Sequence, residues 1–210
     1  MSIKTIGLTY TFGSGQSLTF PDIDCKANES WLLLGNSGSG KTTLLHLIAG
    51  MLRPSSGEVY LADTTLSTLS SANIDHFRGK NIGLMLQTPQ FIKALSLGEN
   101  LLLAQKLSGH ARDPRAAKDL LAQLGLEQYW HKYTFQLSQG EQQRAALARA
   151  VLHEPKIILA DEPTAALDDR NTEVTVQLLD DFAQKVGATL LIVTHDQRLK
   201  SHYKNQLLIH

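Results

Sequence analysis

The sequence predicts an α/β fold whose core holds a mainly parallel sheet, with an antiparallel β portion at the N-terminus and an inserted α-helical lobe. Short apolar runs alternate with stretches of helical periodicity, and several of these runs are apolar on both faces, which is typical of strands buried inside a parallel sheet. Between Leu86 and Lys156 there is no strand signal, only helical periodicity. We therefore expect a core formed by residues 1–87 and 154–210 and a helical lobe formed by residues 88–153, all within one domain.

The individual elements follow from local composition. Two antiparallel strands are expected at 3–10 and 18–26, joined by the turn residues Gly13, Ser14 and Gly15. Strands of the main sheet are expected at 31–34, 57–61, 82–86, 156–160 and 188–194. Helices are expected at 43–49, 97–107, 114–124 and 139–153, with breaks at Gly109, Gly125 and Pro155.

Composition limits the classes of partner. The 210 residues include 20 Lys and Arg and 20 Asp and Glu, so no net positive charge attracts nucleic acid or an anionic membrane, and we expect no nucleic-acid partner. The apolar runs are far shorter than the roughly 18 residues that span a bilayer, so no direct membrane insertion is expected. A single cysteine, Cys25, and a start without the layout of a secretion signal favour the cytoplasm.

A phosphate-binding pattern, G-x-x-x-x-G-K-[ST], follows the apolar strand at 31–34 and precedes a helical run. It consists of Gly35, Asn36, Ser37, Gly38, Ser39, Gly40, Lys41 and Thr42. The glycines let backbone N–H groups turn towards phosphates, Lys41 meets the β- and γ-oxygens, and the Thr42 hydroxyl is suited to Mg²⁺. Thr43 is placed to reach the α-phosphate. A flexible Gly/Ser turn would explain the glycines but not a Lys-Thr pair that opens a helix, so we predict a P-loop nucleotide site, which leaves kinases, GTPases and ATPases open.

Two adjacent acids end the apolar strand at 156–160. Because strand side chains alternate in direction, each acid is free to have its own role. Asp161 is placed to hold Mg²⁺ through water, and Glu162 to orient and deprotonate the water that attacks the γ-phosphate. The alternative is a strand that runs into a polar turn at Pro163, and the preceding P-loop favours the catalytic interpretation.

A second helix start carries an unusual glycine. Ser138 and Glu141 form the S-x-x-E capping-box pattern, which alone would account for both residues. It does not account for Gly140 in the first helical turn, where glycine is unfavourable unless the backbone must approach something closely. A second anion-binding helix end is the natural candidate.

With these residues the chain resembles the ABC ATPase family, whose signature is Leu-Ser-Gly-Gly-Gln. The resemblance spans nearly the whole chain and implies ATP and Mg²⁺ as cofactors. In that family the signature clasps the γ-phosphate of ATP held by the opposite subunit, a role that would fall to Ser138, Gln139, Gly140 and Glu141. Gln139 and Glu141 differ from the residues at these positions of the family signature. Ala165 stands where the family usually has serine, and Ala160 where a larger aliphatic residue is common. None of these changes removes a phosphate ligand or the proposed base.

Other residues follow the order of the family. The resemblance implies that Gln87, at the end of the strand 82–86, senses Mg²⁺ and the attacking water, that Asp168 lies in a dimer-contacting loop at 165–168, and that His195 is the switch histidine. Phe12 aligns with the aromatic residue that stacks on adenine, with Tyr10 as the second choice. Taken singly, Gln87 would be a polar strand end, Asp168 a helix N-cap and His195 a surface histidine.

The resemblance also implies partners and a cellular location. Two subunits, which we expect to be identical, would pack head to tail around two ATP molecules. An integral membrane permease-type subunit would dock in a groove near Pro89, Phe91 and Ile92 on the cytoplasmic face of the membrane. Residues 66–87 resemble the ATPases of lipoprotein release, macrolide export and cell division. Three alternatives stay open: an ABC ATPase that acts on DNA or ribosomes, a small-metabolite P-loop kinase, and a nucleotide-binding scaffold without turnover.

Overall fold

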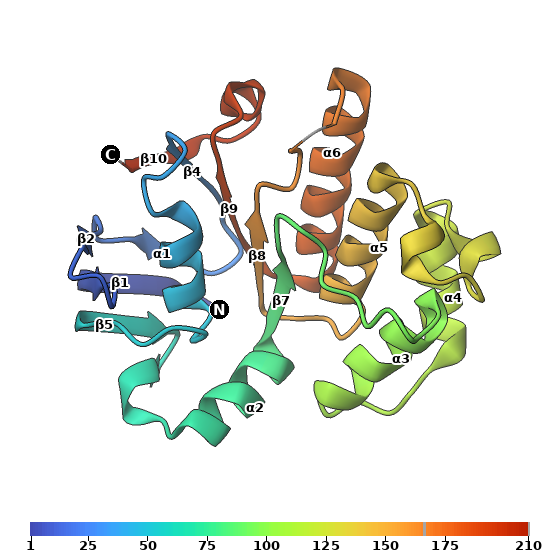
Figure 1. The fold of residues 1–210 in the computed structure, drawn as a ribbon, viewed down its shortest axis with the longest axis horizontal. Helices are drawn as coiled ribbons and strands as arrows, with labels where there is room; N and C mark the ends of the chain where they lie inside the picture. The colour runs from blue at the N-terminus through green and yellow to red at the C-terminus, as the bar shows by residue number, and fades with distance from the viewer. Residues whose placement is uncertain (166, 210) are drawn as a thin grey trace.

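The computed structural model describes residues 1–165 and 167–209, and in this part of the chain the strands form two five-stranded sheets (Figure 1). One sheet is antiparallel and has the order β2-β1-β5-β6, with β3 also paired to β1. The other sheet is parallel throughout and has the order β10-β4-β9-β8-β7. The α/β fold with a parallel main sheet and an N-terminal antiparallel portion is thus confirmed.

The antiparallel sheet is built around its longest strand. It consists of β1 (Ile3–Thr11), β2 (Ser17–Thr19), β3 (Asp24–Cys25), β5 (Ser56–Leu61) and β6 (Thr64–Thr65). The single strand expected at 18–26 is therefore two short strands. Pro21 cannot donate a ladder hydrogen bond, and the Gly7 N–H is bonded instead to the Asp22 carboxylate at 2.7 Å, so the ladder is interrupted there.

The expected placement of residues 57–61 in the main sheet was wrong. This strand, β5, pairs antiparallel with β1 in the other sheet. Its burial alternates, with Val59 and Leu61 buried and Tyr60 between them half-buried. That one-sided pattern is typical of an antiparallel strand and differs from the uniform burial of strands inside a parallel sheet.

The central strands of the parallel sheet are buried on both faces. It consists of β4 (Ser30–Gly35), β7 (Ile82–Met85), β8 (Ile157–Asp161), β9 (Thr189–Thr194) and β10 (Asn205–Ile209). Ile157 and Leu159 of β8 pack in one apolar cluster, with α1 and the antiparallel sheet, whereas Ile158 and Ala160 pack in a second, with helices α3 to α6. Because β7 ends at Met85, Gln87 lies just beyond the strand rather than closing it.

Six α-helices cover the sheets in the described part of the chain (Figure 1). They are α1 (Lys41–Ile48), α2 (Ser71–Asn81), α3 (Leu97–Leu107), α4 (Pro114–Gln123), α5 (Gln139–Val151) and α6 (Asp169–Val186). The stretch between β7 and β8 contains α3, α4 and α5 and no strand longer than an isolated bridge between Ser96 and Tyr133. In Figure 1, α3 and α4 lie at the end of the molecule farthest from the antiparallel sheet. Among the described helices, none combines the length and apolar character needed to cross a membrane.

The contact between β7 and α5 leaves no room for a side chain at Gly83. A Cβ atom at Gly83 would overlap the carbonyl oxygen of Ala150, which is backbone and cannot move aside easily. We expect Gly83→Ala to lower the free energy of unfolding by about 1–3 kcal/mol because of this overpacking. Chemical denaturation measures the effect, and Gly13→Ala is the matched control because a Cβ there meets nothing within 4 Å. Equal stability of the two variants would contradict the prediction.

Candidate functional site

The predicted phosphate loop connects the end of β4 at Gly35 to the start of α1 at Lys41. Gly38 and Gly40 have φ angles of 84° and 87°, which is the left-handed region that favours glycine. Gly40 is the N-cap of α1 and supplies no side-chain cap, so the first N–H groups of the helix keep their hydrogen-bonding capacity. A helix start of this kind is a binding site for an anion such as phosphate.

Lys41 is folded back over this loop. It is only 6% exposed, and its Nζ donates to the carbonyl oxygens of Gly35 at 3.0 Å and Asn36 at 2.9 Å. The Glu162 carboxylate lies 3.7 Å from the same nitrogen. The charge of Lys41 is therefore held at the loop, next to the open N–H groups of α1.

The acids that end β8 lie beside the loop. Thr42 Oγ1 donates to Asp161 Oδ2 at 2.8 Å, whereas Asp161 Oδ1 is buried and has no hydrogen-bond partner among the described residues. Burial raises the pKa of Asp161, against the opposing effect of the Thr42 hydrogen bond. A buried carboxylate oxygen without a partner, next to a hydroxyl, is a donor set that Mg²⁺ prefers, so the residues present fit this ion.

Glu162 is held by the end of β9. Its Oε2 accepts from Thr194 Oγ1 at 2.6 Å, and its Oε1 lies 2.8 Å from His195 Nδ1 and accepts from the His195 N–H at 3.1 Å. The backbone of Glu162 has a φ of 48°, which is uncommon for a residue with a side chain. Such strain persists only where surrounding contacts enforce it, and it is common at functional sites.

Many of the predicted residues line one open cleft of about 350 Å³. Gln16 and Leu18 also belong to its wall and were not predicted, because neither carries a motif. Phe12 lines the cleft, and Tyr10 instead supports Phe12 edge-on, with ring centroids 4.9 Å apart and an interplanar angle of 88°. Phe12 is therefore better placed than Tyr10 to face a bound ligand. The predicted residues in the wall are Phe12, Ser37, Gly38, Gly40, Lys41, Thr42, Thr43, Gln87, Glu162 and His195.

The signature residues are absent from the described wall of this cleft. The capping box is present: Ser138 N and Oγ both donate to Glu141 Oε2, at 2.7 and 2.8 Å. A Cβ at Gly140 would meet only Arg144 Nη1 at 3.8 Å, so nothing in the described chain requires a glycine there. Asp168 N-caps α6 by accepting from the Asn171 N–H at 2.8 Å, as its simpler interpretation predicts. Ala166, in the same predicted loop, lies outside the described residues.

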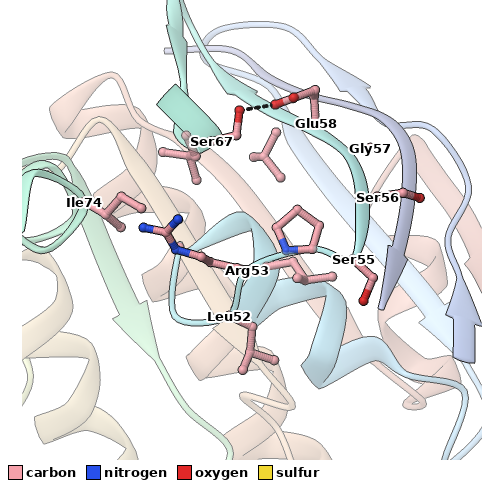
Figure 2. Close-up of a pocket in the computed structure, with 13 residues that line it drawn as sticks. Leu52, Arg53, Ser55, Ser56, Gly57, Glu58, Ser67 and Ile74 are labelled. Atoms are coloured by element: carbon pink, nitrogen blue, oxygen red, sulfur yellow. Dashed lines mark hydrogen bonds between the residues drawn. The ribbon is translucent and has the colours of Figure 1, made fainter. Parts of the chain in front are cut away.

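A second hollow of about 340 Å³ lies between β5, the end of α1 and α2 (Figure 2). Apolar side chains such as Leu47 and Ile74 form part of its wall, and Arg53 and Glu58 are charged residues there. Figure 2 shows the 2.5 Å hydrogen bond from Ser67 to Glu58. None of the predicted site residues lines this hollow, whereas ten of them line the cleft around Lys41.

The geometry of the cleft defines a class of protein. A glycine loop that ends in a buried lysine at a helix start, with two acids on a neighbouring parallel strand, is the site of a P-loop nucleoside triphosphatase. The family model described as ABC transporter matches residues 18–165, and the chain belongs to this family, as one of its ATP-binding and ATP-hydrolysing subunits.

Curated relatives are similar to this chain over nearly its whole length. The lipoprotein-releasing system ATP-binding protein LolD of Idiomarina loihiensis is 36% identical over 200 residues, which cover 93% of this chain and 88% of the relative. The ABC transporter ATP-binding protein YxdL of Bacillus subtilis is also 36% identical and covers 100% of this chain and 82% of the relative.

Solved structures show the same fold. The dimeric structure of MJ0796, a bacterial ABC transporter cassette, has a TM-score of 0.89 at 31% identity and covers 99% of this chain and 94% of that one. A dimeric post-hydrolysis state of MJ0796 bound to ADP and Pi has the same TM-score at 30% identity, with the same coverage.

A network that the sequence did not predict fixes the loop after His195. Asp196 Oδ2 accepts from Thr164 Oγ1 at 2.8 Å and from Arg198 Nη2 at 2.7 Å. Thr164 follows Glu162 closely in the chain, so Asp196 connects the segments that carry Glu162 and His195. The signal in the sequence is only an Asp-x-Arg pair, which is common on protein surfaces.

The Arg198 guanidinium lowers the pKa of Asp196 to about 2. A carboxyl group with a lowered folded-state pKa stabilises the fold above its ordinary pKa near 4, and this contribution disappears as the pH falls from about 4 to about 2. We expect Asp196→Asn to lower the free energy of unfolding by about 1 kcal/mol at pH 7, because solvent screens the half-exposed Arg198. The difference from the unsubstituted chain should vanish near pH 2. Denaturation at several pH values tests this, with the exposed Asp63→Asn as control; a deficit independent of pH would contradict it.

Proposed function

We propose that this chain hydrolyses ATP as one half of a dimer that encloses two ATP molecules and drives a separate membrane subunit. One observation carries the proposal: the signature residues lie outside the cleft that holds Lys41, and Ser138 and Gln139 are exposed to solvent. Among the described residues, the start of α1 is the only helix start in the wall of the cleft. A second copy can supply another.

Within the cleft we assign roles from the contacts. Lys41 and the N–H groups of the loop, from Gly35 to Thr43, bind the phosphates, and Phe12 stacks on the adenine. Thr42 and Asp161 hold Mg²⁺, assisted by Gln87. When bound, this ion offsets the negative charge that the phosphates bring into the cleft. The residues that meet the phosphates and the metal are thus contributed by β4, α1 and β8 and by the segment after β7.

Glu162 is the proposed general base. Thr194 and the backbone of His195 fix its carboxylate, so one oxygen is oriented to accept a proton from an attacking water. His195 contacts that carboxylate directly and is 59% exposed at its side chain, which suits a residue that responds to the γ-phosphate. The other copy would add Ser138, Gln139, Gly140 and Glu141 at this phosphate, with Asp168 at the contact between copies.

The membrane partner would dock where the segment after Gln87 meets the helices. We propose residues 1–87 and 154–210 as the α/β core and residues 88–153 as the helical lobe. Phe91 is half-buried with the Arg149 guanidinium 4.7 Å from its ring centroid, and Ile92 is 49% exposed. Together with Pro89 they form an apolar surface suited to a short helix of a permease-type subunit at the cytoplasmic face of the membrane. The LolD relatives favour a role in the lipoprotein-release group.

If Glu162 is the general base, its substitution should stop ATP hydrolysis without preventing ATP binding. Glu162→Gln should lower ATP hydrolysis at least about 100-fold while ATP still binds, because the carboxamide keeps the shape and loses the basic oxygen. Sizing chromatography of this variant should show a dimer with ATP and a monomer without it. Glu173→Gln, at an exposed carboxylate of α6, is the matched control and should hydrolyse normally. An unchanged rate of ATP hydrolysis in Glu162→Gln would contradict the assignment of Glu162 as the general base.

Mixing two inactive variants tests whether the site is shared between copies. Lys41→Ala and Ser138→Arg should each be inactive alone, since every dimer of either variant has two broken sites. In a mixed dimer, the intact Lys41 of one copy faces the intact Ser138 of the other. An equal mixture should therefore recover activity, up to roughly a quarter of the unsubstituted level if one site suffices. No recovery, although mixed dimers form, would argue for a site complete within one chain.

A further inference from the structure

His153 is a buried histidine without a partner. It follows the end of α5, it is 8% exposed, and neither of its ring nitrogens has a hydrogen-bond partner in the described chain. A buried polar group without a partner costs stability, and its presence needs an explanation. Burial lowers the pKa of His153 to about 4; the Ile82 backbone lies close enough to the ring to oppose this shift but not in the geometry of a hydrogen bond, so the ring is neutral near pH 7. A neutral imidazole is the form that binds metal ions.

A second histidine faces it from the segment after α3. The ring centroids of His110 and His153 are 6.4 Å apart, and the rings are tilted by 57°. The Ser108 hydroxyl donates its one hydrogen to the Gln105 carbonyl oxygen at 2.8 Å. At 3.0 Å from His110 Nδ1 it therefore accepts, so the neutral His110 ring carries its proton on Nδ1 and has a free lone pair on Nε2.

From this juxtaposition we propose that His110 and His153 bind a first-row divalent metal ion, Zn²⁺ in the first instance. Two imidazoles on one tetrahedral ion, with Zn–N distances of about 2.0–2.1 Å, place their ring centres roughly 5–5.5 Å apart, so the exposed His110 ring would move about 1 Å towards His153 to bind the ion. Ser108 acts as a positioning residue, because it fixes the ring of His110 and leaves Nε2 for the ion. Water would complete the coordination, so we expect micromolar rather than tighter affinity.

The proposed metal site is separate from the ATP cleft. Ile82, whose backbone lies near His153, is the first residue of β7, whereas Glu162 and His195 follow the last residues of β8 and β9. In a parallel sheet, the start of one strand and the residues that follow its neighbours lie at opposite ends of the strands. A bound ion would connect the segment after α3 to the segment between α5 and β8, so it would join two parts of the chain that are far apart in sequence.

Calorimetric titration of the nucleotide-free chain, without a histidine tag and with excess Mg²⁺, measures Zn²⁺ binding. We expect one site per chain, weakened at least about tenfold by His110→Gln or His153→Gln and by about tenfold by Ser108→Ala. His76→Gln, at an exposed histidine of α2, is the matched control and should bind as the unsubstituted chain does. Zn²⁺ should also raise the thermal unfolding midpoint of the control but not of His110→Gln.

The side chain of His110 is exposed, so its substitution leaves the core intact even if His153→Gln fails to fold. Zn²⁺ binding that is undiminished in His110→Gln would overturn the proposal, as would the absence of micromolar binding to the unsubstituted chain. Because these readouts use no nucleotide, they are independent of the ATP-dependent dimer.

Discussion

Two acids buried side by side at the end of β8 are the constraint on which the rest of the site depends. Asp161 and Glu162 are 2% and 5% exposed, and buried carboxylates are costly unless donors reach them. The donors come from separate elements: Thr42 from α1, Thr194 and His195 from the end of β9, with Lys41 nearby. The acids are therefore tolerated only if these elements meet at one edge of the sheet.

The register of the parallel sheet brings them together. Leu34 pairs with Thr194 and Asp161 with Val193, so the ends of β4, β8 and β9 lie level and the loops after them share one edge. This arrangement requires a sheet covered on both faces, which α1 with the antiparallel sheet and α5 with α6 provide. The packing of the apolar strands and the chemistry of the site are consequently two results of the same register.

The sequence was most informative where a local pattern decides the structure. β8 and β9 each contain an unbroken run of four apolar residues, and the glycines around Lys41 require left-handed backbone, so both could be predicted. The partner of β5 could not, because pairing with β1 depends on chain topology rather than on local composition. Helix α2 was missed because Ile74 is its only buried apolar residue, which leaves no apolar stripe to detect. Edge strand β10 was also missed: only its last three residues are apolar, and its positions alternate between half-buried and exposed before the buried Ile209.

Within the site, the residues in motifs could be predicted, and the contacts that fix them could not. The role of Thr194 as a donor to Glu162, and the bracing of the His195 loop by Asp196, depend on distances between strands that no linear pattern encodes. The interpretation of Asp168 shows the reverse case. Its N-cap contact is confirmed, while a dimer role requires a second copy and stays a prediction.

The charge of the cleft supports the proposal that a single chain is an incomplete phosphate site. Lys41 contributes one positive charge and the acids beside it contribute two negative ones when ionised, so a triphosphate entering this cleft meets repulsion at short range. A divalent cation held by Asp161 would reverse that balance on one side. On the other side, the N–H groups at the start of α1 add partial positive charge, and the start of α5 could add more only from a neighbouring copy. In the proposed dimer, the exposed start of α5 from one copy and the start of α1 in the other would therefore form the two halves of one anion site.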